Sequence, residues 1–517
     1  MDLTKDIVAK EKQKIKISKK IFINGIYKDS ASGKSFNNTS PIDGKLINTI
    51  SFAQKEDVDI AVKVSRKIFE KGSWSKSAPS HRKKVLLRFA DLLEKHRLEL
   101  ALLDTIDVGK TINDTYNADI PASIDNIRWY AEIIDKIYDD IAPTPQNIIG
   151  MITKEPIGVV GAIVPWNYPL WMAVWKLAPA LITGNSVILK PAEQSPMSAI
   201  RIGELLVEAG LPEGVFNVLP GDGPITGKSM CLHNDIDCIA FTGSGEVGKL
   251  ILQYSGQSNM KRIQLECGGK SPNIVFADHD DLDMVAEKSA YAIFGNQGEV
   301  CSAGSRLIIQ KEIEKDFISK LSSLSKTMMP GDPFDPNSFM GAVVDKAQLD
   351  KIDSYVKIGK KEGATLVVGG KKSMESTGGY YYEPTIFTEV KNSMKIAREE
   401  IKEYWLIGTE EYDEYLKKLT PGEETNNWNE IEEDAEYAGR TVKLNNPTKG
   451  DTKKFKVYVR NDKGNIVKVE FGDPNMEIKR DDPKRLKAFR ARFGCDKDPG
   501  PKWKAKYWAC KFWEKGK

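Results

Sequence analysis

The pattern of apolar and polar positions changes period repeatedly between residues 159 and 254. Short continuous apolar runs, typical of buried strands, occupy residues 159–164, 186–189, 216–219 and 238–241. Each run precedes a stretch with a helical period, at 170–181, 197–209, 225–232 and 246–254. Four strand–helix units in a row indicate a parallel sheet that is covered by helices on both faces.

Two further regions have regular patterns. Residues 56–69 and 80–103 are amphipathic with a helical period. A second series predicts strands at 273–276 and 307–310 and helices at 282–294 and 313–324. The expected fold class is therefore α/β, with a doubly wound sheet domain and a second α/β domain.

Length and composition limit the class of protein. A chain of 517 residues is about twice the size at which one hydrophobic core stops growing, so at least two domains are expected. No apolar run approaches the ~18 residues of a membrane span, and the net charge of +3 is too small to indicate a nucleic-acid partner for the whole chain. Six scattered cysteines and an N-terminus without an apolar signal region favour a cytoplasmic protein.

The chain changes character near Ile401, and five of the ten Trp residues lie beyond this position. Residues 402–450 carry 6 basic and 12 acidic side chains, net −6, whereas residues 451–517 carry 20 basic and 10 acidic ones, net +10. All four His residues precede this boundary, so no Cys/His metal site is expected in the tail. Alternating residues at 454–460 and 466–471 predict a β-hairpin.

A glycine-rich turn is a candidate nucleotide site. Gly243, Gly245 and Gly248 form the pattern G-x-G-x-x-G between a predicted strand and helix, where backbone N–H groups can approach a phosphate. An ordinary glycine-rich turn would look the same. Taken generically, the acidic residue about 20 positions further on, which binds ribose in Rossmann proteins, would be Glu266. A second set of motifs gives Glu266 a different role.

Four short motifs follow one another between residues 165 and 301. They are Pro-Trp-Asn-Tyr-Pro at 165–169, Leu-Lys-Pro-Ala-Glu at 189–193, Leu-Glu-Cys-Gly-Gly-Lys-Ser-Pro at 265–272 and Asn-Gln-Gly-Glu-Val-Cys at 296–301. In this order and at these separations they resemble the NAD-dependent aldehyde dehydrogenase superfamily. The resemblance implies a Rossmann-like NAD-binding domain at residues 20–257 and a catalytic α/β domain at 258–401.

The resemblance implies three catalytic residues. Aldehyde oxidation needs a nucleophile, and a thiolate forms a tetrahedral adduct and leaves a hydrolysable thioester. This role matches Cys301, whose small and polar neighbours suit a buried structural thiol poorly. Asn167, otherwise an N-cap residue, matches a donor to the oxyanion together with the Cys301 backbone N–H. Glu266, otherwise a solvated residue at a strand end, matches the general base that activates water.

The resemblance also implies that the cofactor is NAD. Lys190 and Glu193 match the residues at the adenosine ribose, and a carboxylate at Glu193 would repel the 2′-phosphate of NADP. The other positions that match the dinucleotide site are Pro165, Trp166, Gly223, Gly227, Phe241, Gly243, Ser244 and Glu400.

An aromatic stripe on the helix after Asn167 consists of Tyr168, Trp171, Met172 and Trp175. Such a stripe often belongs to a core. In the betaine- and aminoaldehyde-oxidising branches of the family, however, residues matching Tyr168 and Trp175 line the aldehyde tunnel, where aromatic rings hold an ammonium group. Residues 258–278 are also similar to the γ-glutamyl-aminobutyraldehyde branch. We therefore expect an ω-aminoaldehyde or its γ-glutamyl derivative as the substrate.

The resemblance ends at Ile401. The family continues with further catalytic-domain segments and with the strand through which its subunits associate, and their absence leaves an unpaired edge and exposed apolar surface. We therefore expect an incomplete catalytic domain and no family-type homo-oligomer. Because a small misplacement of reacting groups costs on the order of 100-fold in rate, turnover at least that far below an intact homologue is expected.

The two ends of the chain are expected to lie outside these domains. Residues 1–19 are predicted to be a flexible extension, 402–450 an acidic linker region, and 451–517 a small basic β-rich module that weakly resembles proteins of tailed phages. Residues 502–513 interleave aromatic and cationic side chains, which suits either nucleic-acid contact or a small Trp core. The alternative function is a catalytically impaired fusion whose module at 451–517 binds nucleic acid or a virion component. A recombined or misassembled reading frame would show the same break.

Overall fold

The computed structural model describes residues 3–399 and, beyond them, the strands Asp434–Tyr437, Arg440–Lys443, Thr448–Lys449, Phe455–Arg460 and Ile466–Phe471. The chain divides into two units, Met1–Ile407 and Gly408–Lys517. The predicted NAD-binding and catalytic domains both lie in the first unit.

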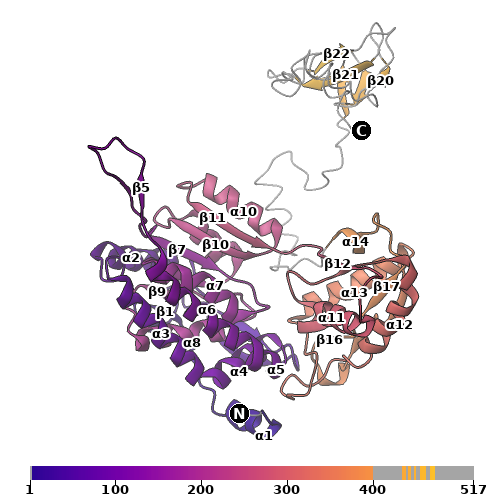
Figure 1. Ribbon diagram of the computed structural model, residues 1–517, viewed down its shortest axis with the longest axis horizontal. Coiled ribbons are helices and arrows are strands. Elements are labelled where there is room, and N and C mark those ends of the chain that lie inside the picture. Colours follow the sequence, from indigo (N-terminus) through magenta and orange to yellow (C-terminus); the bar gives the residue numbers. More distant parts are fainter. Residues whose placement is uncertain are drawn as a thin grey trace. The chain divides into compact units, whose positions relative to one another are not determined.

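A seven-stranded sheet, with strands in the order β11-β10-β7-β8-β9-β1-β2, lies at the centre of the N-terminal half (Figure 1). Five strands are parallel: β7 (Val159–Ile163), β8 (Ser186–Lys190), β9 (Phe216–Val218), β10 (Cys238–Gly243) and β11 (Arg262–Cys267). β1 (Ile21–Ile23) pairs antiparallel with β9 and with β2 (Ile26–Lys28). The strand order reverses beside β7, and such a switch point opens a crevice at the carboxyl ends of the strands.

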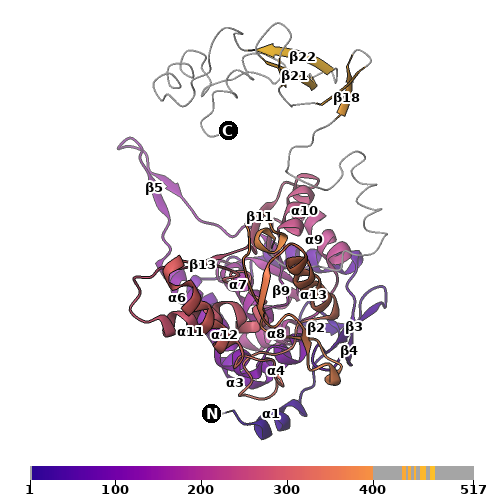
Figure 2. The ribbon, with the colours of Figure 1, turned by 90° about the vertical axis from the view of Figure 1, so that its right-hand side faces the viewer.

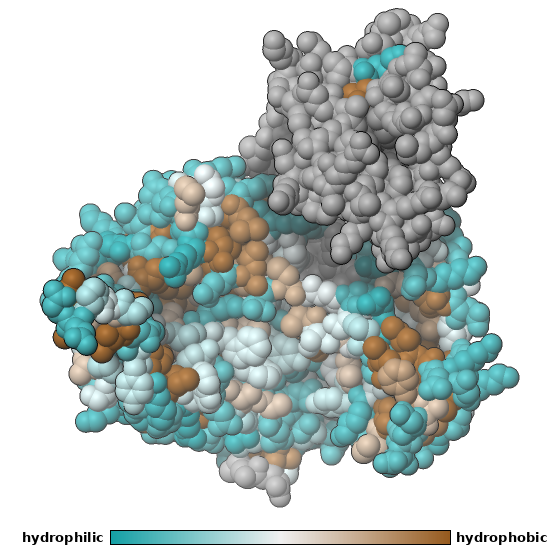
Figure 3. All heavy atoms as spheres, turned by 45° about the horizontal axis from the view of Figure 1, so that its top comes forward, coloured by the Kyte–Doolittle hydropathy of each residue, from teal (hydrophilic) through white to brown (hydrophobic). Residues whose placement is uncertain are grey.

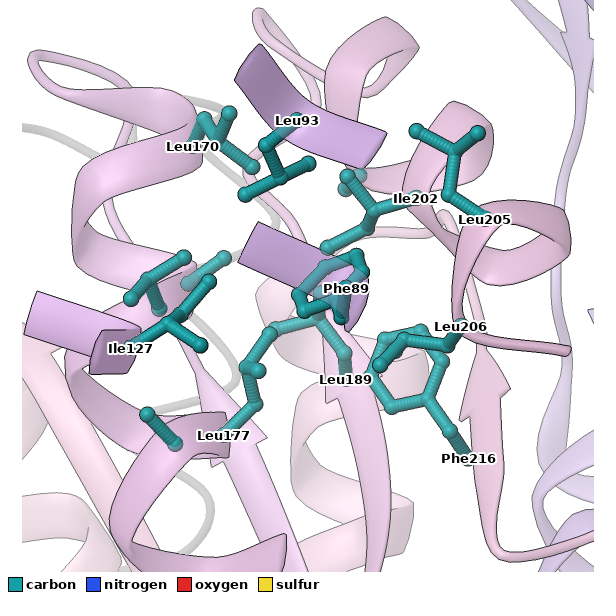
Figure 4. Close-up of a cluster of buried hydrophobic side chains, with 14 of the residues drawn as sticks. Phe89, Leu93, Ile127, Leu170, Leu177, Leu189, Ile202, Leu205, Leu206 and Phe216 are labelled. Carbon is teal, nitrogen blue, oxygen red and sulfur yellow. The ribbon is translucent and has the colours of Figure 1, made fainter. Parts of the chain in front are cut away.

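Helices cover both faces of this sheet. One face packs against α3 (Pro79–Lys95), α6 (Ile120–Ile133), α7 (Pro169–Ile182) and α8 (Met197–Ala209). Figure 4 shows this core, in which Phe89, Leu177 and Phe216 meet Leu189 of β8. The other face packs against α2 (Lys55–Lys71), α9 (Lys228–Leu232) and α10 (Gly245–Gly256). The predicted doubly wound arrangement is therefore confirmed.

Two predictions in this region differ from the structure. The helix predicted at 80–103 is two helices, α3 and α4 (Arg97–Val108), which are separated at His96 (φ −100°, ψ 16°). Both helices bury apolar faces in one core, so the apolar period continues across the break. The predicted boundary at residue 257 divides the sheet, because β11 pairs in parallel with β10.

The second α/β part begins after β11. β12 (Pro272–Val275) and β13 (Arg306–Ile309) pair in parallel and pack against α11 (Leu282–Phe294) and α12 (Glu314–Ser325). Further along lie α13 (Lys346–Lys361), the pair β14 (Thr365–Val368) and β17 (Ile386–Thr388), and the pair β15 (Lys372–Ser373) and β16 (Tyr381–Tyr382). Ile274, Phe276 and Ile308 are at least half exposed beside the two-stranded sheet.

A hairpin of β5 (Asp140–Ala142) and β6 (Gly150–Ile152) projects from the first unit in both ribbon views (Figures 1 and 2). Apolar side chains gather on its surface (Figure 3), and Tyr138, Ile141 and Ile149 are each 77% exposed. Clustered apolar surface of this kind is typical of contact sites.

The N-terminal extension, which was predicted to be flexible, contains a helix. Residues Lys5–Lys12 form α1, whose first turn is capped by the Thr4 side chain. Val8 is 1% exposed because it packs into the core beside α4. The three adjacent apolar residues Ile7, Val8 and Ala9 among charged residues gave no periodic signal for this docking.

In the C-terminal unit, β21 (Phe455–Arg460) and β22 (Ile466–Phe471) pair antiparallel, as their alternation predicts, and β20 (Thr448–Lys449) joins β21. β18 (Asp434–Tyr437) and β19 (Arg440–Lys443) pair inside the region predicted to be an acidic linker. The stretch at 502–513 and most of residues 402–450 lie outside the described residues, as does Glu400.

Candidate active site

The predicted site residues follow the carboxyl ends of neighbouring parallel strands. Asn167 follows β7, Glu193 follows β8, Gly243 ends β10 and Glu266 lies at the end of β11. Because parallel strands end at one edge of a sheet, residues far apart in the sequence face one crevice.

The buried Lys190 and the partly buried Glu193 form an ion pair at this edge. The Lys190 side chain is fully buried, and its Nζ donates to the carbonyl oxygens of Pro191 (2.9 Å) and Gly221 (2.6 Å). Its Nζ lies 3.8 Å from Oε2 of Glu193. Burial lowers the pKa of Lys190 and raises the pKa of Glu193 to about 7.

Glu193 has one acceptor position that suits a ribose hydroxyl. Its Oε1 accepts the N–H of Gly223 at 3.0 Å, whereas Oε2 is buried and has no hydrogen-bond partner among the described residues. A buried oxygen without a hydrogen bond is costly, so a hydroxyl donor at Oε2 would be favourable. Gly227 lies beside Lys190, with a Cβ position 3.7 Å from the Lys190 Cδ. These residues fit the ribose end of a dinucleotide.

The turn between β10 and α10 is held by close packing. A Cβ on Gly243 would lie 2.5 Å from the ring of Phe241, so only glycine fits there. Phe241 is fully buried, so its side chain supports the turn and has no surface for a ligand. Ser244 caps α10 by accepting the N–H of Val247 at 3.3 Å. Helix N-termini of this kind favour anions such as phosphate.

The segment before Asn167 is also packed against other parts of the site. Trp166 is 6% exposed and packs with Val108, Ala192 and Val344, and Pro165 is buried. Ala192 belongs to the Lys190–Glu193 segment. The packing of Trp166 therefore joins the segment after β7 to the segment after β8.

Asn167 lies beside the turn that carries Cys301. Its Nδ2 donates to the carbonyl oxygen of Glu299 at 2.8 Å, and the Asn296 Nδ2 donates to the Asn167 carbonyl oxygen at 3.2 Å. An amide group has two N–H donors, so one donor of Asn167 remains after the bond to Glu299. The Cys301 thiol is exposed and forms no disulfide. The structure thus brings the predicted donor next to the chain segment of the predicted nucleophile.

The turn before Cys301 has an unusual backbone. Asn296 (φ 48°), Gln297 (φ 57°) and Gly298 (φ 78°) are left-handed in succession. Non-glycine residues in this region cost about 1–3 kcal/mol each. The Gln297 side chain holds the turn, because its Oε1 accepts the N–H of Gly341 (3.0 Å) and its Nε2 donates to the Ala342 carbonyl (3.1 Å). The sequence did not single out Gln297, although an amide beside a glycine in the motif was a signal.

Glu266 is exposed at the end of β11, so water can reach its carboxylate. The Glu266 carboxylate interacts electrostatically with Lys176 of α7. Burial lowers the pKa of Lys176, and the charges of Glu266 and Cys267 partly oppose this shift. Glu266 is less suitable as a ribose ligand than Glu193, which has the buried oxygen without a hydrogen bond.

The aromatic stripe divides between core and crevice. Met172 is 6% exposed and belongs to the core, whereas Trp175 is 43% exposed. The ring centroids of Tyr168 and Trp171 are 5.5 Å apart, and those of Trp171 and Trp175 are 5.9 Å apart, both edge to face. The stripe therefore forms a continuous aromatic wall from Tyr168 to the exposed Trp175.

A buried charge cluster, which the sequence patterns missed, lies behind Tyr168. The Lys110 Nζ is 3.6 Å from the Tyr168 ring centroid and 2.6 Å from Oδ2 of Asp119. Burial raises the pKa of Tyr168, and the charges of Asp119, Asp114 and Cys301 raise it further. Tyr168 therefore interacts electrostatically with both the acidic cluster and the thiol.

A pocket of about 220 Å³ adjoins the acidic cluster. Its carboxylate is Asp114, and the rings of Tyr291 and Phe339 meet edge to face with centroids 6.1 Å apart. Burial raises the pKa of Tyr291, and the charges of Asp114 and Asp119 add to this effect. The lining consists of Asn113, Asp114, Tyr291, Gly295, Pro336, Asn337, Ser338 and Phe339.

A doubly wound nucleotide-binding sheet whose crevice borders an exposed thiol and an amide donor defines a class of dinucleotide-dependent oxidoreductases with a cysteine nucleophile. The model of the aldehyde dehydrogenase family matches residues 27–402. The chain belongs to this family, which confirms the fold, the enzyme class and the family that the sequence predicted.

Known relatives agree with this assignment. The chain is 46% identical over 385 residues to the NADP/NAD-dependent aldehyde dehydrogenase PuuC of Escherichia coli K12, covering 74% of this chain and 77% of that protein. It is 48% identical to the structure of γ-glutamyl-γ-aminobutyraldehyde dehydrogenase from Burkholderia cenocepacia, with a TM-score of 0.76 over 77% of this chain and 80% of that one. A structure of indole-3-acetaldehyde dehydrogenase with bound NAD+ is 50% identical, with a TM-score of 0.76 over 77% and 81% of the two chains.

These comparisons favour the enzyme over the alternative of a nucleic-acid-binding or virion-binding fusion. That alternative depends on residues 451–517, of which the structure describes only strands β21 and β22. Within the part of the chain that is described, no helix has the length and apolar character needed to cross a bilayer.

Proposed function

We propose that this protein oxidises an ω-aminoaldehyde, or its γ-glutamyl derivative, to the carboxylic acid with NAD. The observation that carries the proposal is the position of Asn167 beside the turn of Cys301, at the edge of the sheet where Glu193 and Glu266 also lie. The names of the related proteins, which include a γ-glutamyl-γ-aminobutyraldehyde dehydrogenase, support the substrate class.

In this proposal the Cys301 thiolate attacks the aldehyde carbonyl carbon, and the carbonyl electron pair moves onto oxygen. The free donor of Asn167 and the backbone N–H of Cys301 stabilise that oxyanion. Bound NAD supplies the acceptor for the hydride that leaves the carbonyl carbon. The resulting thioester is hydrolysed when Glu266 takes a proton from water, the water oxygen attacks, and the C–S bond breaks to release the thiolate.

The dinucleotide would be held by residues that the sequence singled out. Lys190 and Glu193 would bind the adenosine ribose, because Glu193 has a buried oxygen without a hydrogen bond. Gly223, Gly227, Gly243 and Ser244 would let the backbone approach the cofactor, while Pro165, Trp166 and Phe241 would hold those segments in place. Glu400, proposed at the nicotinamide ribose, lies outside the described residues.

A cationic substrate is supported by charges and rings around the thiol. Tyr168 and Trp175 form the ends of the aromatic wall, and aromatic faces attract ammonium groups by roughly 0.5–2 kcal/mol. Asp114 and Asp119 add negative charge next to Tyr168, and the Lys110 ammonium, which pairs with Asp119, offsets part of it. A neutral aldehyde of equal length gains only the apolar contacts.

Single-turnover and steady-state assays of NADH formation test the roles of the side chains. Cys301→Ala should abolish NADH formation with NAD binding intact, whereas Cys267→Ala, which removes another exposed thiol, should retain it. Glu266→Gln should give a burst of NADH and then a slow steady state, because hydride transfer precedes thioester hydrolysis. Normal turnover by Cys301→Ala, or an equal loss of both phases in Glu266→Gln, would contradict these roles.

Three sequence predictions remain proposals. We infer reduced turnover, no family-type oligomer, and a cytoplasmic location. The four described cysteines form no disulfide, which suits a reducing compartment. Size-exclusion chromatography with an NADH assay on one purified sample tests the first two. A stable tetramer with ordinary turnover would show that both are wrong, and cell fractionation tests the third.

A further inference from the structure

The N-terminal helix contacts a loop of the second α/β part. α1 packs beside α4 (Figures 1 and 2) and buries Val8. On the same helix, the Lys5 Nζ lies 2.7 Å from Oδ2 of Asp335, and the Lys12 Nζ lies 3.5 Å from the centroid of the Phe334 ring. Two cations of α1 therefore hold neighbouring residues of one loop.

This loop, residues 332–338, is bonded internally. The Asp335 N–H and the Ser338 hydroxyl both donate to the Asp332 carbonyl oxygen, at 2.9 and 2.7 Å. Asp335 Oδ1 accepts the N–H of Asn337 at 3.1 Å, while its Oδ2 faces Lys5. The loop is thus a single unit, and a shift at Asp335 is transmitted to Asn337 and Ser338.

The far end of the loop is one wall of the pocket beside Asp114. Pro336, Asn337 and Ser338 line this pocket opposite Asn113 and Asp114. On the near side, the N–H of Ile112 donates to the Pro333 carbonyl at 2.8 Å. The width of the pocket therefore depends on how the loop is held against residues 112–114.

We propose that α1 positions this pocket wall, with Lys5 and Lys12 as positioning residues for the distal, cationic end of the aldehyde. The family match begins at residue 27, so α1 lies outside it. The proposal that this pocket takes the substrate rests on the proposed function. The proposal that α1 holds the loop rests on the contacts alone.

The test reverses the charge of both lysines, in Lys5→Glu/Lys12→Glu of the full chain. Repulsion from Asp335 and loss of the ring contact should release the loop, giving faster hydrogen exchange of the backbone amides at 332–339. The KM for an ω-aminoaldehyde should rise about three- to tenfold, with kcat and the KM for NAD unchanged. The KM for a neutral aldehyde of equal length should change less.

Two matched variants control for charge and folding. Lys5→Arg/Lys12→Arg keeps both cations and should behave as wild type. Lys10→Glu changes the net charge by −2, as Lys5→Glu alone does, at a residue that is exposed and forms no ion pair with a described residue, and it should have no effect. If the double reversal lowers the unfolding temperature strongly, Lys5→Glu alone is used, since the Lys5 side chain is 66% exposed.

Unchanged exchange at 332–339 in a folded charge-reversed variant would overturn the proposal. An equal loss for cationic and neutral aldehydes through kcat would also overturn it, because that result indicates general damage. If the wild type oxidises no aldehyde, the proposed function fails, while the exchange measurement still decides whether α1 holds the loop.

Discussion

Replacing Lys110 with methionine tests the balance of charges behind Tyr168. The side chains of Lys110 and Asp119 are 2% and 3% exposed, and their charged atoms are 2.6 Å apart. Burial raises the pKa values of Asp119 and Asp114, and the Lys110 ammonium opposes both shifts. Methionine is similar in length but uncharged, so Lys110→Met leaves buried carboxylates without their cation.

Breaking a buried pair by removing one partner costs about 3–5 kcal/mol, and we expect this loss in the free energy of unfolding at about pH 8. The loss should depend on pH. Without Lys110 the folded-state pKa values of the carboxylates rise further above their unfolded values. The variant is then most stable at low pH, where these carboxyl groups are protonated. Its free energy of unfolding falls as the pH rises through their folded-state pKa values. The variant should therefore approach the wild type at about pH 5.

Urea unfolding followed by Trp fluorescence at both pH values measures the effect. Lys110→Met/Asp119→Leu removes both charges. Its loss in the free energy of unfolding should be smaller than the sum of the losses of the two single variants. Lys357→Met is the matched surface control: Lys357 pairs with Asp353 at 2.7 Å but is 75% exposed, so its loss should stay below about 1 kcal/mol. The reasoning would be refuted if Lys110→Met lost as little free energy of unfolding as this control, or if its loss were independent of pH.

Three further substitutions give distinct readouts. Burial raises the pKa of Asp104 to about 7, so the stability of the wild type falls as the pH rises toward that value. Asp104→Asn should therefore raise the free energy of unfolding more at about pH 8 than at about pH 5, as urea titrations can measure. Gly243→Ala should lower stability by about 1–3 kcal/mol in thermal unfolding, because its Cβ would lie 2.5 Å from the Phe241 ring; Gly256→Ala, with no atom within 4 Å, is the control. Glu193→Gln should weaken NAD binding about tenfold or more in fluorescence titrations. It should also remove the gain in affinity expected as the pH rises through about 7, where the Glu193 carboxyl ionises.

The helical period predicted several elements well. The helices expected at 197–209 and 282–294 coincide with α8 and α11, because each has one apolar face and ends beside a glycine. The break at His96 was missed, since α3 and α4 bury their apolar faces in the same core. Periodicity reports which face is buried, and it does not report whether the axis changes direction.

The order of the strands in the sheet was harder to predict from the sequence than the strands themselves. The predicted boundary at residue 257 assigned β11 to the second domain, yet β11 pairs in register with β10 over Cys238–Gly243. Which strands pair by hydrogen bonds depends on how the whole sheet is assembled. The local pattern of β11 is compatible with either domain.

The sequence by itself determined which chemical groups follow the strands: the thiol of Cys301, the amide of Asn167 and the carboxylates of Glu193 and Glu266 stand in motifs that can be read locally. Only the tertiary structure decided that Asn167 meets the Glu299 carbonyl, that Lys110 lies between Asp119 and Tyr168, and that α1 holds the loop at 332–338. Contacts of this kind join residues far apart in the chain, and their energies depend on burial and distance. Neither quantity has a period along the sequence, so no local pattern could reveal them.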